Sequence, residues 1–116
     1  MDQDDTEWLA SLERKIAAGA PVPLDHRGHL RVAWTILGEH ALDEAVRRTE
    51  GLLRALLAAH ARQRGPSEHA PRYDAALTWG WVAIIAARRG EHTSFAAFLA
   101  HNPDLLDGRT RILVAA

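Results

Sequence analysis

The stretch ALTWGWVAIIAA, residues 76–87, constrains the fold of this chain more than any other feature of its sequence. It carries no charged residue and is apolar on every side of the helix that its composition favours. A membrane span needs about 20 apolar residues, whereas the longest continuous apolar run here extends only from Trp79 to Ala87. The stretch is therefore predicted to be a buried helix of a globular protein, with other helices packed around it.

The rest of the chain alternates between helical periodicity and helix-breaking segments. Apolar residues recur at helical spacing over residues 5–18, 26–37, 42–64 and 72–89, and a shorter helix is expected from about Thr93. The segments GAPVP and RGPSEHAP interrupt this pattern. The segment NPDLLDG predicts a further short helix. The tail, residues 109–116, is expected either to dock on the protein or to pair with another subunit. We predict an all-α fold: one domain over residues 1–116, a bundle of five or six helices around a central apolar helix at about 72–89.

Composition excludes several classes of function. A formal charge of −1 over 116 residues argues against a nucleic-acid-binding surface, which needs clustered basic residues. The absence of cysteine excludes disulfides, thiolate metal sites and thiol nucleophiles. The acidic start MDQDDTEW is unlike a signal peptide, so a cytoplasmic protein without a membrane association is expected.

The segment LDHRGHLRVAW contains two histidines, His26 and His29, at the start of a predicted helix. Residues three apart lie on one helix face, and this face continues through Ala33, Ile36 and Leu37, which are typical core residues. Both imidazoles are therefore predicted to point inward, where each needs a hydrogen-bond partner. Two adjacent imidazoles can hold a divalent metal or act as acid and base.

Asp74 is the predicted third member of this site. It lies in the first turn of the apolar helix, in line with a stripe that is otherwise suited to burial. His26, His29 and Asp74 would form a two-histidine, one-carboxylate set that leaves open positions on Zn, Fe or Mn. The alternative is structural: Asp74 is a first-turn acid favoured by the helix dipole, and the histidines bond to loop carbonyls.

Several neighbouring residues are candidates for the wall of the same pocket, namely Tyr73, Trp34, Thr78, Trp81 and Arg72. Tyr73 would donate a hydrogen bond or a proton, or else pack at the helix end. The tryptophans would line a cavity for a flat ligand, although aromatic residues at this spacing are more often core. Thr78 would orient the Asp74 carboxylate or bond back to its own helix. Arg31 and Arg72 would bind an anionic substrate or lie on the solvated surface.

The same residues resemble a group of small bacterial helical proteins. Its pattern is Phe-x-His-x-x-His-Leu-x-x-Ala-Trp, then Lys-Tyr-His-x-Thr-Leu-Thr, then Asn-Pro-x-Leu-Leu-Asp. This chain keeps most of that pattern over residues 24–108, at His26, His29, Leu30, Ala33, Trp34, Tyr73, Leu77, Thr78, Asn102, Pro103, Leu105, Leu106 and Asp107. It departs from the pattern at Leu24, Arg72, Asp74 and Ala76, and Asp74 replaces the third histidine. The resemblance implies a helical standalone protein with a His/His/third-residue pocket, serving specialised small-molecule metabolism.

These observations predict a small enzyme in which His26, His29, Asp74 and Tyr73 perform acid–base chemistry on a small organic molecule. Isomerisation, cyclisation, elimination and hydrolysis all suit neutral histidines beside a carboxylate, with or without one divalent metal. No motif for an organic cofactor is present. The alternative is a non-enzymatic module that binds a small molecule or forms a homodimer, with a structural His/Asp cluster. A cavity beside the histidines favours the enzyme, whereas Trp34, Tyr73 or Trp81 filling that space favours the alternative.

Overall fold

The computed structural model describes residues 4–64, 72–73, 75–106 and 113–114, and helices dominate this part of the chain. The elements are α1 (Asp5–Ala17), α2 (His26–Leu37), α3 (Leu42–Arg64), α4 (Ala75–Arg88), α5 (Phe95–His101) and the short 3-10 helix η1 (Pro103–Leu106). Two residue pairs, β1 (Arg72–Tyr73) and β2 (Leu113–Val114), form an antiparallel two-stranded ladder with Arg72 opposite Val114. The predicted all-α bundle is confirmed. The fourth helix begins at Ala75 rather than at Arg72, because Arg72 and Tyr73 pair with the tail instead.

Side-chain caps and glycines explain where the helices begin and end. The Asp25 side chain accepts a 2.8 Å hydrogen bond from the Gly28 amide and so caps α2. Ser94 caps α5 in the same way through the Ala97 amide. Gly19 and Gly90 follow α1 and α4 with φ of 83° and 56°, a left-handed conformation that side-chain-bearing residues rarely adopt.

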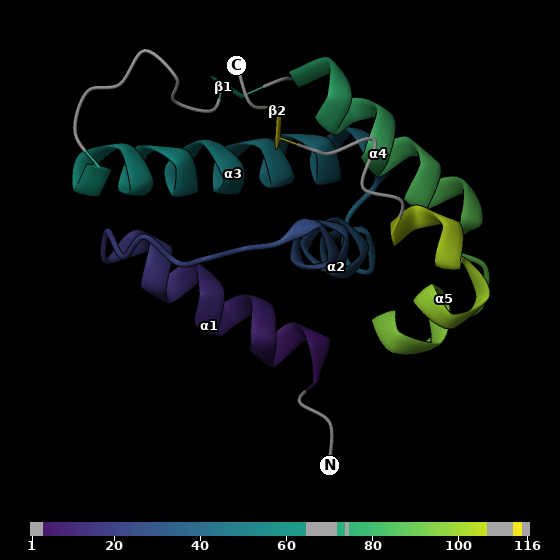
Figure 1. Cartoon of the computed structure of the whole chain (residues 1–116). Coiled ribbons are helices and arrows are strands. Elements are labelled where there is room, and N and C mark those ends of the chain that lie inside the picture. The colour runs from purple at the N-terminus through teal and green to yellow at the C-terminus, as the bar shows by residue number, and fades with distance from the viewer. Residues whose placement is uncertain (1–3, 65–71, 74, 107–112, 115–116) are drawn as a thin grey trace.

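Helix α2 lies at the centre of the bundle. Figure 1 shows α2 nearly end-on, with α1, α3, α4 and α5 around it, and α2 packs against each of these four helices. Most of its residues are buried, and Leu30, Val32 and Ala33 have 0% exposure. The sequence predicts that the apolar helix at about 72–89 lies at the centre. In the structure α2 lies there instead, because it is buried on several sides.

Helix α4 instead packs with one face and leaves the other open. Its buried residues are Thr78, Trp81, Val82 and Ile85. On the opposite side, Trp79 is 48% exposed and Ile84 is 42% exposed. In the part of the chain that the structure describes, no helix combines the length and the apolar character needed to cross a membrane.

Two consecutive arginines at the end of α4 have different environments. The Arg89 guanidinium lies over the Trp34 ring, 4.3 Å from its centroid, and donates a 2.6 Å hydrogen bond to the Trp34 carbonyl. That carbonyl belongs to the last turn of α2, where backbone acceptors lack helical partners. Burial lowers the pKa of Arg89. Arg88 forms an exposed ion pair with Asp104 at 2.7 Å. Arg89 therefore joins α4 to α2, whereas Arg88 stays on the surface.

We expect Arg89→Ala to lower the free energy of unfolding by about 2 kcal/mol, because it removes a cation–π contact and a hydrogen bond to a helix-terminal carbonyl. Arg88→Ala is the matched control and should cost about 0–1 kcal/mol, as exposed ion pairs do. Urea unfolding followed by circular dichroism measures both values. Equal losses in the two variants would contradict the role assigned to Arg89.

Candidate functional site

His26 lies where α2, α4 and η1 meet. It is the first residue of α2 and is half-buried, and its Nε2 atom lies 2.8 Å from the carbonyl oxygen of Leu105 in η1. Because a carbonyl oxygen can only accept, Nε2 carries the proton and donates it to this bond. The ring meets Trp81 of α4 in a T-shaped arrangement, with ring centroids 5.1 Å apart and an angle of 70° between the planes. These two contacts fix both the position and the tautomer of the imidazole.

The other ring nitrogen of His26, Nδ1, is not used by the bond to the Leu105 carbonyl. Nδ1 is buried and has no hydrogen-bond partner among the residues that the structure describes. In a neutral imidazole with the proton on Nε2, Nδ1 carries a lone pair. A buried polar atom is normally paired, since leaving it unpaired is costly. This lone pair can therefore accept a proton, a ligand hydrogen or a metal ion.

The structure places the other predicted site residues on two different sides of α2. His29 is buried at 7% exposure, as expected for an inward-facing position one turn after His26. Thr78 at 0% and Trp81 at 6% line the buried face of α4, and Trp81 contacts His26 directly. Trp34 packs instead against Phe95 and Phe98 of α5, with ring centroids 6.4 Å apart in each pair, so it is a core residue.

Three of the predicted site residues are not fully described by the structure. Asp74 lies outside the described residues, and so do the side chains of Arg72 and Tyr73, whose backbone forms β1. Within the described ranges, no group of three or more His, Cys, Asp or Glu residues is arranged to hold a metal. The set of His26, His29 and Asp74 thus stays a prediction.

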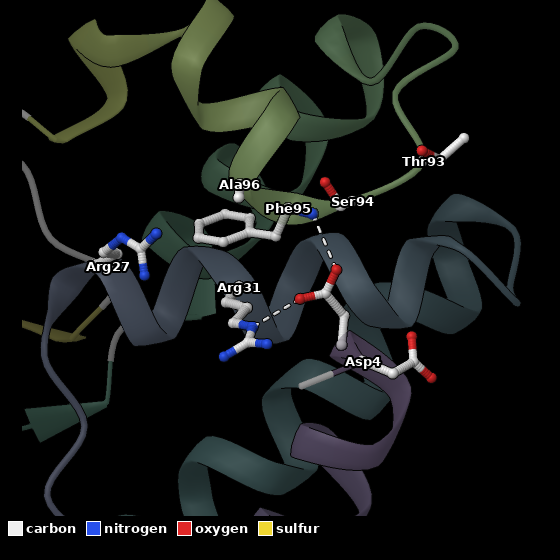
Figure 2. Close-up of a pocket in the computed structure, with 8 residues that line it drawn as sticks. Asp4, Arg27, Arg31, Thr93, Ser94, Phe95 and Ala96 are labelled. Carbon is white, nitrogen blue, oxygen red and sulfur yellow. Dashed lines mark hydrogen bonds and ion pairs between the residues drawn. The ribbon is translucent and has the colours of Figure 1, made fainter. Parts of the chain in front are cut away.

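A hollow that no sequence pattern predicts lies on another face of α2. Figure 2 shows it between the start of α1, helix α2 and the start of α5. Its volume is about 380 Å³. Its lining consists of Asp4, Asp5, Arg27, Arg31, Thr93, Ser94, Phe95 and Ala96. This volume is within the range of small-molecule sites.

Asp5 connects three helices at the edge of this hollow. One carboxylate oxygen accepts from Arg31 Nε at 2.8 Å, and the other accepts from the Phe95 amide at 2.9 Å. The Arg31 side chain is 20% exposed and its guanidinium lies over the Trp8 ring, 4.4 Å from the centroid. Arg31 is therefore a partly buried structural cation rather than a solvated one. No local pattern could have indicated this, because Asp5 and Phe95 are 90 residues apart.

Arg27 and Asp4 are the remaining charges of the hollow. The Arg27 guanidinium lies over the Phe95 ring at 5.3 Å, and both Arg27 and Asp4 are exposed. Asp5 and Arg31 form an ion pair and neutralise each other. The Arg27 guanidinium and the Asp4 carboxylate therefore remain as the charged groups that a ligand in the hollow would meet. This balance suits a neutral polar or zwitterionic ligand better than a strongly charged one.

Comparisons of this chain with protein-family models, with curated proteins and with solved structures gave no match. The resemblance to the small bacterial helical proteins therefore stays a prediction.

We expect nitrogen-15 NMR of the neutral side chains to find the proton of His26 on Nε2. The same tautomer is expected for His60, whose Nε2 lies 2.9 Å from the Val22 carbonyl oxygen. His101 is the internal contrast, because its Nδ1 lies 2.9 Å from the Ala97 carbonyl oxygen and should carry the proton. A His26 spectrum that matches His101 rather than His60 would show that Nδ1 is not the available atom.

Proposed function

We propose that this protein is a small all-α enzyme in which His26 Nδ1 accepts a proton from a small organic substrate. The observation that carries the proposal is the buried Nδ1 lone pair, which has no partner among the described residues. His29 and Asp74 are the proposed partners in proton transfer. Isomerisation, cyclisation, elimination and hydrolysis of a small molecule are the reaction classes that this chemistry serves.

The contacts of His26 support this role physically. When Nδ1 takes up a proton, the ring becomes an imidazolium, and the Leu105 carbonyl at Nε2 then accepts from a cation, which strengthens the hydrogen bond. The same bond prevents the ring from turning away. Trp81 packs against the ring with centroids 5.1 Å apart, and this contact fits the non-enzymatic alternative equally well, so the proposal depends on the buried Nδ1 atom.

A divalent metal is an extension of the same proposal. A carbonyl at one ring nitrogen is the arrangement that orients a metal-ligating imidazole, leaving the other nitrogen for the ion. His26, His29 and Asp74 would hold Zn, Fe or Mn, which would polarise a substrate oxygen or lower the pKa of a bound water. The acid–base role of His26 does not depend on this ion.

The test is turnover of a panel of small organic molecules by the full chain, followed by mass spectrometry, in native protein and in His26→Gln. The glutamine amide can still donate to the Leu105 carbonyl, so the fold should be kept while the base is lost. We expect a substrate whose turnover falls about 10²- to 10⁴-fold in His26→Gln, the usual contribution of a general base. A folded His26→Gln variant with native turnover would contradict the proposal.

The second candidate function is non-enzymatic binding of a small molecule in the hollow of Figure 2. The volume of about 380 Å³ and the exposed guanidinium of Arg27 favour it. Ligand-observed NMR with the same panel separates the two functions. Compounds whose binding is lost in Arg27→Gln but kept in His26→Gln, without turnover, would assign the protein to this class.

A further inference from the structure

Two histidines outside the proposed site lie side by side near α5. His92 belongs to the segment between α4 and α5, and His101 is the last residue of α5. Their ring centroids are 4.7 Å apart, with 36° between the planes. Nothing in the proposed function of His26 uses this pair.

Both rings are held in place by α5. His101 Nδ1 lies 2.9 Å from the Ala97 carbonyl oxygen, so Nδ1 donates and the lone pair is on Nε2 of this exposed residue. The His92 ring meets Phe98 in a T-shaped arrangement, with ring centroids 6.0 Å apart and an angle of 74° between the planes. Phe98 is fully buried and gives the His92 ring a rigid support. A backbone acceptor at one nitrogen is how proteins orient an imidazole for a metal ion at the other.

We propose that His92 and His101 together bind a borderline divalent transition-metal ion such as Zn²⁺. Two imidazoles on one tetrahedral Zn²⁺, with Zn–N distances of about 2.0–2.1 Å, have ring centres roughly 5 Å apart. The observed separation of 4.7 Å is close to this value. Imidazole nitrogen is a preferred ligand for Zn²⁺, Cu²⁺ and Ni²⁺, whereas Mg²⁺ and Ca²⁺ prefer oxygen.

Water completes the coordination in this proposal. No third His, Cys, Asp or Glu joins the pair in a cluster within the described residues, and Asp104 nearby in sequence is engaged by Arg88. The site is therefore open rather than closed, and its ion can exchange or accept a further ligand. An ion here would tie the segment before α5 to the end of that helix.

The experiment is calorimetric titration of the untagged full chain with Zn²⁺, in native protein and in single variants. His92→Ala and His101→Ala should each weaken the same binding event at least tenfold, because each removes one of two protein ligands. His40→Ala, in the turn between α2 and α3, is the control and should bind as the native protein does. NMR of the zinc-loaded protein should show His101 bound through Nε2 with its Nδ1 proton retained.

The titration also separates this site from the proposed enzymatic site. His26→Gln should leave zinc binding at His92 and His101 unchanged. A second zinc-binding event that is lost only in His26→Gln would report binding at the proposed site of His26. Native zinc affinity in either His92→Ala or His101→Ala overturns the proposal. If an alanine variant fails to fold, His92→Gln and His101→Gln replace it, because glutamine keeps the bulk of the side chain without an imidazole nitrogen.

Discussion

The burial of α2 against four other helices is the interaction on which the rest of the structure depends. Leu30, Val32 and Ala33 are completely enclosed, and α2 packs against α1, α3, α4 and α5. Phe95 and Phe98 of α5 close one side of this core around Trp34. Because α2 is held so firmly, its first residue, His26, has a fixed position at the meeting point of α2, α4 and η1.

Single polar contacts then join distant segments to this frame. His26 binds the carbonyl of Leu105, His60 binds the carbonyl of Val22, and Asp5 binds the amide of Phe95. Each bond satisfies a backbone group that a loop or a helix end would otherwise leave unpaired. His26 differs from His60 in the feature on which the proposed function depends: its second nitrogen is buried and has no partner among the described residues. The same bond thus supports the fold and, in the proposed function, holds the ring in the orientation needed for proton transfer.

The sequence predicted the helices well because their signals are local. The bounds of α2 and α3 follow from the Asp25 cap, Gly38 and the apolar periodicity, and they agree with the structure. The predicted inward face of α2 also holds for His29, which is buried. These features depend on neighbouring residues, and tertiary packing does not alter them.

The arrangement of the helices was less predictable, because composition shows which residues can be buried but not which are. Helix α4 is the most apolar, yet Trp79 and Ile84 are exposed, while the more polar α2 is central. Thr35 is tolerated inside α2 because its hydroxyl donates to the Arg31 carbonyl, 2.7 Å away. The hollow at Arg27 depends on Asp5 reaching Phe95, a contact for which the sequence contains no signal.

The most direct test of the account is a high-resolution diffraction study of crystals grown near neutral pH, to identify the atom that faces His26 Nδ1. The account predicts a water, a ligand hydrogen-bond donor or a metal ion within bonding distance of Nδ1, with Nε2 still donating to the Leu105 carbonyl. A His26 ring turned into bulk solvent, or an Nδ1 occupied by a backbone amide of its own helix, would contradict it.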